Sequence, residues 1–177
     1  MDAKLYAKIL ALVPLLKSLS PDEVNEIMAI SKLLKVRKGV KVVEEGEAGE
    51  AMYILVEGSA QVTKKLPNGE STPLAELKAP TVFGEMALID REPRSASVTT
   101  LTDTVLFQVD MQAFNDLRAR YRPAAFKVLR GIAPTICSRL RHLNDRIGEF
   151  FKNPESNLAE LEQQFLNRQM GMPAKRR

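Results

Sequence analysis

The chain has 177 residues, of which 45% are hydrophobic and 27% charged, the balance of a single folded soluble domain with a short extension. Its longest apolar run, Ile9 to Leu16, has eight residues and contains Pro14. A bilayer span needs about 20 apolar residues and a signal peptide needs a small-residue cleavage site, so neither membrane insertion nor export is predicted. A single cysteine, Cys137, permits no internal disulfide, which favours the reducing cytoplasm.

Charge is unevenly distributed along the chain. Residues 1–110 carry a net −3 and residues 111–177 a net +7. A basic C-terminal part is typical of a protein that binds nucleic acid, an acidic membrane or an acidic protein, and equally of a solvated helix. Cys137 and His142 lie five residues apart on one predicted helix, and we interpret them as a buried thiol and a surface imidazole. We therefore predict no metal, no cofactor and no enzymatic activity.

Residues 1–34 are predicted to form an N-terminal helical segment. Ser20 reads as the N-cap of a helix, followed by Pro21 at the first helical position and by the acidic pair Asp22 and Glu23. Apolar residues recur at helical spacing on both sides of this cap: Leu5, Ile9, Leu12, Leu15 and Leu16 before it, and Val24, Ile27, Met28, Leu33 and Leu34 after it.

Residues 35–110 contain short β-rich runs separated by glycine, proline or asparagine, which is typical of an antiparallel sandwich or barrel. One segment, Phe83 to Ile89, interrupts them and predicts a single helical turn. The predicted strands are Val40–Val43, Met52–Val56, Ala60–Leu66, Thr72–Leu77, Ala96–Leu101 and Val105–Val109.

Residues 111–153 return to a helical pattern and are expected to act as hinge and lid. A first helix is marked by Phe114, Leu117 and Tyr121, and Pro123 is placed to start a second, with a kink or break expected near Gly131–Pro134. The second helix carries an a/d heptad seam: Phe126, Leu129, Ala133, Ile136, Leu140, Leu143, Ile147 and Phe150. Residues 154–177 are expected to form a short amphipathic helix, with Leu158, Leu161 and Phe165 on its apolar side, and a basic tail.

Gly84, Glu85 and Arg94 are the residues best suited to bind a ligand. Unsatisfied N–H groups at the start of a helical turn attract an anion, and glycine lets the ligand approach the main chain. An arginine fork grips two phosphate oxygens, and a carboxylate accepts a hydrogen bond from a sugar hydroxyl. A Glu85–Arg94 ion pair that braces the loop explains the same residues equally well.

The segment Phe83–Ile89 together with Pro93–Val98 resembles the phosphate-binding cassette of the cyclic nucleotide-binding domain family, whose members include catabolite-activator-like and kinase regulatory-subunit-like proteins. Val13–Leu16, Gly46–Glu50 and Met52–Gly58 resemble other parts of that family, and the similarity runs from about Leu5 to Arg146. The resemblance implies an α+β fold, with an antiparallel eight-stranded β roll flanked by N-terminal helices and a long C-terminal helical segment that covers the nucleotide.

Under this resemblance, Arg94 pairs with the cyclic phosphate and Glu85 accepts the ribose 2′-OH, while backbone groups of Gly84, Ala87 and Ser95 complete the cradle. Apolar side chains of the roll contact the base. The C-terminal helix caps it with Arg139, Leu140, Leu143 or Asn144. The full set of implied site residues is Gly84, Glu85, Met86, Ala87, Arg94, Ser95, Ala96, Val62, Leu74, Val82 and Phe83.

The ligand is expected to be cAMP rather than cGMP. Ser95 does not decide between them, because a hydroxyl residue after the cassette arginine favours cGMP in kinases that resemble this family, whereas bacterial regulators with Arg-Ser respond to cAMP. The 26 residues after Phe151 are too few for a winged helix-turn-helix, so we expect a stand-alone, bacterial-type sensor without a DNA-binding domain.

The expected sensor signals to a separate protein effector, which it contacts through residues 158–165 or the basic tail. The seam in residues 126–150 either pairs with a second subunit as a homodimer or packs against its own roll. Two other functions stay open: a scaffold that keeps the fold without binding nucleotide, and a nucleic-acid-binding regulator that uses the basic tail.

Overall fold

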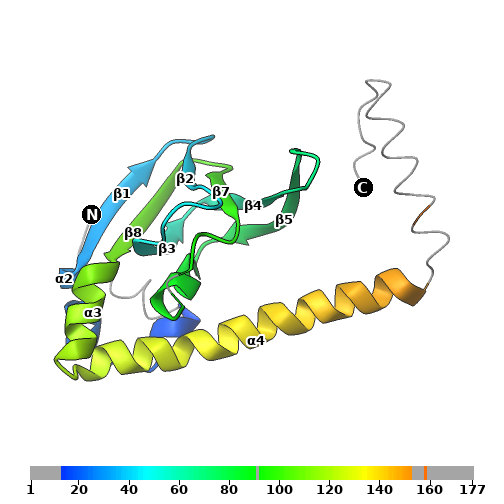
Figure 1. Ribbon diagram of the computed structural model, residues 1–177. Helices are drawn as coiled ribbons and strands as arrows, with labels where there is room; N and C mark the ends of the chain where they lie inside the picture. The colour runs from blue at the N-terminus through cyan, green and yellow to red at the C-terminus, as the bar shows by residue number, and fades with distance from the viewer. Residues whose placement is uncertain (1–12, 91, 153–157, 159–177) are drawn as a thin grey trace. The chain divides into compact units, whose positions relative to one another are not determined.

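The computed structural model describes residues 13–90, 92–152 and 158. The chain divides into two compact units, Met1–Thr135 and Ile136–Arg177. Figure 1 shows the helices and strands coloured by residue number. The predictions for residues 1–12, for Leu161 and Phe165 and for the basic tail lie outside the described residues.

The first unit contains all the strands and short helices, and helix α4 continues from it into the second unit. In chain order the elements are the 3₁₀ helix η1 (Pro14–Leu16), α2 (Pro21–Ala29), β1 (Ser31–Val36), β2 (Lys41–Val43), β3 (Ala51–Glu57), β4 (Ser59–Lys65), β5 (Ser71–Lys78), β6 (Thr81–Phe83), the 3₁₀ helix η2 (Glu85–Leu88), β7 (Ser97–Thr100), β8 (Thr104–Asp110), α3 (Met111–Ala119) and α4 (Pro123–Lys152).

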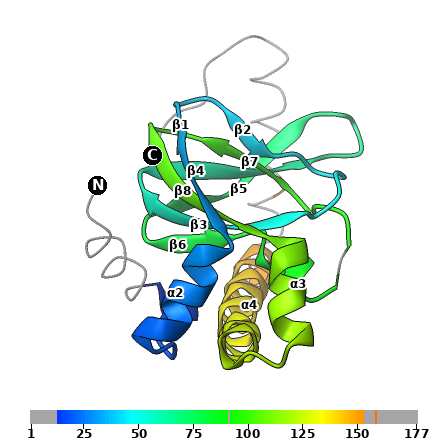
Figure 2. The ribbon, with the colours of Figure 1, turned by 90° about the vertical axis from the view of Figure 1, so that its left-hand side faces the viewer.

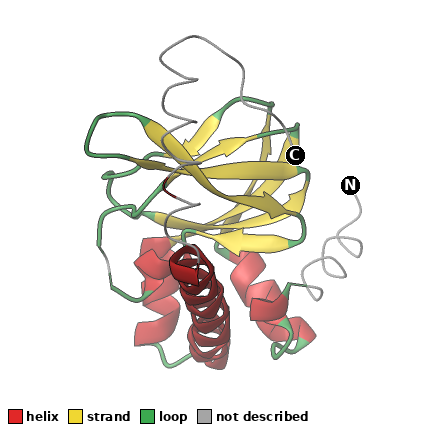
Figure 3. Ribbon diagram, turned by 90° about the vertical axis from the view of Figure 1, so that its right-hand side faces the viewer, coloured by secondary structure: helices red, strands yellow, loops and turns green. Residues whose placement is uncertain are grey.

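The strands form two four-stranded antiparallel sheets, ordered β1-β8-β3-β6 and β2-β7-β4-β5. Helices α2 and α3 lie together on one side of the strands (Figures 2 and 3). The α+β class and the eight-stranded β roll expected from the resemblance are therefore confirmed.

The interior of the roll is an apolar cluster drawn from both sheets. Tyr53 of β3 and Phe83 of β6 are opposite each other in register and stack with ring centroids 5.1 Å apart. Side chains alternate along a strand, so Ile54, between Tyr53 and Leu55, faces away from this interior. The buried members of the cluster are Val43, Ala51, Tyr53, Leu55, Ala60, Phe83, Val98 and Leu106.

Helix α2 begins as the sequence predicts. The Ser20 hydroxyl accepts a hydrogen bond from the Glu23 amide, and the Glu23 carboxylate accepts one from the Ser20 amide, which together make a capping box. Glu23 also pairs with Lys127 at 2.7 Å, and Glu26 pairs with Arg122. These two ion pairs connect α2 to the start of α4.

The predicted helical segment ends too late, because Ser31–Leu34 belong to strand β1 and not to a helix. Leu34 packs against the interior of the roll, whereas Leu33 is 41% exposed. Pairing with β8, in register from Ser31 opposite Val109 to Val36 opposite Thr104, determines this conformation. Strand β6, which has three residues, was also absent from the predicted strands.

Of the kink or break expected near Gly131–Pro134, the break is wrong, because α4 is a single helix that contains Pro134. Gly131 has a packing role instead: a Cβ added there would lie 2.7 Å from the Leu15 carbonyl oxygen. The interpretation of Cys137 as a buried thiol is also wrong, since its side chain is exposed.

Candidate functional site

The interruption in the β region is the single helical turn that the sequence predicts, η2, and it begins directly after Gly84. Gly84 has φ +70°, a left-handed conformation that glycine adopts at low cost. A Cβ on Gly84 would lie 2.7 Å from Nη1 of Arg94 and 3.3 Å from the carbonyl oxygen of Ala51. Both the backbone conformation and the space therefore require glycine.

Arg94 is only 9% exposed, and two carbonyl groups hold its guanidinium. Nη1 donates to the Gly84 carbonyl at 3.2 Å, and Nη2 donates to the Ala51 carbonyl at 2.6 Å. A guanidinium has five N–H groups, and within the described residues no acceptor is recorded for the other three. The side chain is thus an oriented cation with donors left for an anion.

Burial and the neighbouring groups act in opposite directions on the pKa of Arg94. Burial lowers the pKa of Arg94, and Tyr53 and the nearby carboxylates of Glu47, Glu50 and Glu85 raise it. An arginine stays protonated under such shifts, so the site holds a permanent positive charge. Glu85 itself is 1% exposed, and its charge acts on Arg94.

The cassette is fastened to the loop between β2 and β3. The Arg94 amide donates to the Glu47 carbonyl at 2.8 Å, and the Gly46 amide donates to the Arg94 carbonyl at 2.9 Å. Gly49 lies against Ala87, where an added Cβ would come within 2.5 Å of the Ala87 Cβ. Two segments singled out in the sequence, Gly46–Glu50 and the cassette, are therefore one site.

The remaining predicted site residues separate into three groups. Val62 and Phe83 face the interior of the roll with Tyr53, and Ala87 is buried in η2. Val82 is buried opposite Ile54 and faces away from that interior. Ala96 is half-buried, and the others are exposed: Leu74, Met86 and Ser95.

Two contributors were missed by the sequence reasoning. Ala51 supplies a carbonyl oxygen to Arg94, and Tyr53 stacks on Phe83 and is close enough to influence the charge of Arg94. A backbone acceptor has no signature in the sequence. Tyr53, by contrast, lies in the quoted segment Met52–Gly58, and the strand's period of two could have placed it beside Leu55.

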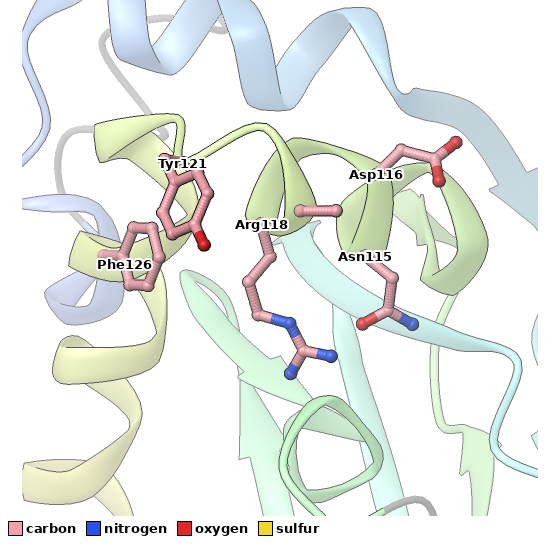
Figure 4. Close-up of a pocket in the computed structure, with 6 residues that line it drawn as sticks. Asn115, Asp116, Arg118, Tyr121 and Phe126 are labelled. Atoms are coloured by element: carbon pink, nitrogen blue, oxygen red, sulfur yellow. The ribbon is translucent and has the colours of Figure 1, made fainter.

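The bend between α3 and α4 contains an open pocket of about 470 Å³ (Figure 4). Tyr121, just beyond the end of α3, has φ +53° and is 82% exposed, and its ring stacks with that of Phe126 at 6.4 Å. None of the predicted cassette residues lines this pocket, whose walls are Asn115, Asp116, Arg118, Ala119, Tyr121 and Phe126.

Neither a metal cluster nor a membrane-spanning helix occurs in the part of the chain that the structure describes. No group of three or more His, Cys, Asp or Glu side chains there could hold a metal ion. No helix among the same residues is long and apolar enough to cross a bilayer.

Comparison with known proteins agrees with the fold described above. The model of the cyclic nucleotide-binding domain matches residues 33–121. Glutaminase 1 of Bradyrhizobium diazoefficiens is 33% identical over 138 residues, which are 78% of this chain and 22% of that protein. The cAMP-dependent protein kinase regulatory subunit of Aspergillus niger is 35% identical over 64% of this chain and 27% of that protein.

Among solved structures, a cyclic nucleotide-binding domain from Methylobacillus flagellatus superimposes with a TM-score of 0.73 at 26% identity, over 81% of this chain and 83% of that one. The chain therefore spans about a quarter of the length of the two curated relatives but most of an isolated domain.

Proposed function

The chain belongs to the cyclic nucleotide-binding domain family, and we propose that it is a cAMP sensor that holds the cyclic phosphate with Arg94. The observation that carries the proposal is the state of that side chain. A buried cation is costly unless an anion or several hydrogen-bond acceptors compensate its charge. In Arg94, two carbonyl oxygens orient the guanidinium, and its other N–H groups have no acceptor recorded within the described residues. A cyclic phosphate monoanion satisfies both the charge and the donors.

The ribose and the base are assigned to the residues at the positions that match the family's cassette and roll. Glu85, buried beside Arg94, accepts the ribose 2′-OH, and backbone groups of Gly84, Ala87 and Ser95 complete the phosphate cradle. Val62 and Leu74 contact the base from β4 and β5, and Phe83 supports them from the interior. We do not include Val82 among the base contacts, because it lies on the face of β6 opposite to that of Phe83.

The preference for cAMP over cGMP rests on the kinase regulatory subunit among the relatives, whose name specifies cAMP. Ser95 is exposed, and a direct contact from its hydroxyl to a guanine amino group would reverse the preference. Titration with both nucleotides and with a cyclic dinucleotide distinguishes these ligands.

The signal is carried by the helices that follow β8. A ligand shifts a conformational equilibrium only if it binds two states with different affinity. The turn at Tyr121, between α3 and α4, is the hinge we assign to this change. The output is a protein effector in the cytoplasm, and the chain itself is assigned no catalytic step.

A comparison of two variants tests the phosphate assignment by calorimetric titration with cAMP. Arg94→Ala removes the buried charge that meets the phosphate, and a loss of about 30-fold to several thousand-fold in affinity is expected. Lys78→Ala is the control, because Lys78 is exposed and its partner Glu76 is 3.8 Å away. Equal affinities for both variants and the wild type would refute the assignment.

A thermal-shift measurement separates the sensor from a scaffold that binds nothing. Saturating cAMP stabilises a binding-competent native state by a few kcal/mol, about 2.7 at a hundredfold excess over Kd. An unchanged Tm in the presence of cAMP, cGMP and a cyclic dinucleotide would favour the scaffold.

A further inference from the structure

Lys64 on β4 contacts the cassette from a different strand. Its Nζ donates to the Ser95 carbonyl oxygen at 2.7 Å and pairs with Glu45 Oε1 at 2.8 Å. The contact joins a side chain of β4 directly to the carbonyl group of the residue after Arg94.

Glu45 holds the lysine in place through bonds of its own. Its Oε2 accepts a hydrogen bond from the Lys65 amide at 2.8 Å, and its own amide donates to the Ser97 hydroxyl at 2.9 Å. The Glu45 side chain is 17% exposed, and the Lys64 ammonium is the main reason that the pKa of its carboxyl lies below the ordinary value. The Lys64 ammonium is therefore held by a carboxylate and by the Ser95 carbonyl of the cassette at the same time.

The orientation of two peptide groups follows from these contacts. Both peptide bonds after Arg94 are trans, so the C=O and N–H of each point in opposite directions. The Arg94 carbonyl is held by the Gly46 amide, which turns the Ser95 N–H away from Gly46. The Ser95 carbonyl is held by Lys64, which turns the Ala96 N–H away from Lys64.

Neither of these amides has an acceptor recorded within the described residues. Both directly follow the arginine that is assigned to the phosphate. An ammonium on the Ser95 carbonyl also polarises the peptide group, which makes the Ala96 N–H a stronger donor.

From this arrangement we propose that Lys64 is a positioning residue of the cyclic-phosphate site, acting through the Ser95–Ala96 peptide group. The inference rests on the function proposed above. Lys64 does not touch the ligand: it holds the peptide so that the Ala96 N–H is a donor for the bound cyclic phosphate.

Titration of three variants with cAMP tests the role of Lys64. Lys64→Met keeps the length of the side chain without a donor, and an affinity about 10-fold below wild type is expected. Lys64→Arg restores a donor and a charge, and its affinity should return to within about threefold of wild type. Lys65→Met is the matched control, because Lys65 Nζ is 4.0 Å from Glu44, and a change below about twofold is expected.

Two further readouts separate positioning from general stability. The Tm of ligand-free Lys64→Met should fall only modestly below that of the wild type, since Lys64 is 44% exposed, although its partner Glu45 is 17% exposed. The affinity is measured well below that Tm, where the variant is folded. In the wild type, the Ala96 amide resonance should move downfield when cAMP saturates the protein, and that movement should be lost in Lys64→Met.

The outcomes are distinguishable. If the wild type and Lys64→Met bind cAMP equally well, the role of Lys64 is overturned and the proposed function stays intact. The same holds if the wild type binds cAMP and its Ala96 amide resonance does not move. Equal weakening by Lys64→Met and Lys65→Met also overturns it. Wild-type protein that binds no cyclic nucleotide overturns the proposed function instead.

Discussion

At the scale of single residues, Gly84 and Arg94 depend on each other. The left-handed backbone at Gly84 turns its carbonyl toward the guanidinium, and the absence of a Cβ leaves room for Nη1. A side chain at this position would act on the arginine directly, because Nη1 lies where the Cβ would be.

Gly84→Ala should therefore lose both stability and ligand affinity. The left-handed conformation alone costs a non-glycine residue about 1–2 kcal/mol, and displacement of Arg94 adds an affinity loss of about 10-fold or more. Gly69→Ala is the control, because Gly69 has φ +84° and nothing within 4 Å of an added Cβ. Thermal unfolding and cAMP titration should show that both variants lose stability and only Gly84→Ala loses affinity.

From the residue types alone, Gly84, Glu85 and Arg94 suit an ion pair that braces the loop as well as a ligand site, and their ligand roles came from the resemblance to the family. The short turn after Gly84 could be predicted, because it depends on local residues. Two contacts of the site could not be predicted from the sequence. The Ala51 carbonyl bonds to Arg94 from 43 positions away, and every residue has such a carbonyl. Lys64 bonds to Ser95 from 31 positions away, and nothing in the sequence distinguishes it from other surface lysines. The face that Val82 occupies could not be predicted, because the three-residue strand β6 was not among the predicted strands and the strand decides which face a residue occupies.

At the scale of elements, helix α4 packs closely against η1 at Gly131. An added Cβ there would lie 2.7 Å from the Leu15 carbonyl oxygen and 3.2 Å from Leu15 Cδ1. The backbone oxygen cannot move away as a flexible side chain would, so the helix itself would have to shift.

Gly131→Ala should accordingly destabilise the protein by about 1–3 kcal/mol despite its better helix propensity. Gly148→Ala lies in the same helix with nothing within 4 Å of the added Cβ, and it should stabilise by about 0.5–1 kcal/mol. Denaturant unfolding of the two variants measures the difference, and the same sign of change in both would contradict the packing role of Gly131.

The ion pair of Glu26 with Arg122 predicts a pH-dependent contribution to stability. The hydrogen bond from Arg122 is the main cause that lowers the pKa of Glu26. Because the native pKa is depressed, the contribution is complete above the unfolded value of about 4.3 and is lost as pH falls through the native pKa. The Tm of Glu26→Gln should therefore lie below wild type at pH 7, with a difference that shrinks toward pH 3.

Glu57→Gln is the control for that experiment, since Glu57 is exposed and no side-chain bond is recorded for it within the described residues. A difference between Glu26→Gln and wild type that stays constant from pH 7 to pH 3 would contradict the assignment to the ion pair.

The elements themselves were predictable to different degrees. The cap at Ser20 and the turn η2 depend on local residues, and both are confirmed. Strand β1 depends on β8, more than 60 residues later, and the spacing of Leu33 and Leu34 suits a helix as well as a strand. Pro134 is tolerated within a long helix, where the remaining hydrogen bonds and the packing at Gly131 outweigh its local cost.

At the scale of the whole molecule, the heptad seam in α4 is the surface that we propose for a homodimer. In the second unit Leu140, Leu143 and Ile147 follow one another at steps of three and four and are 46% to 55% exposed. Pairing with the same seam of a second subunit would bury this stripe.

Sedimentation equilibrium tests this association. Wild-type protein should be dimeric at micromolar concentration, and Leu143→Glu should be monomeric because it places a charge in the seam. Ser138→Glu puts the same charge on another face of α4 and should leave the dimer intact. Wild-type protein that is monomeric with and without cAMP would contradict the dimer and leave the nucleotide site unaffected.

The most direct test of the central claim is a crystal structure of the protein with cAMP. We expect a phosphate oxygen within about 3 Å of the Arg94 guanidinium, and the ribose 2′-OH at the same distance from the Glu85 carboxylate. Density for cAMP in the pocket between α3 and α4, with Arg94 bonded only to the carbonyls of Ala51 and Gly84, would contradict it.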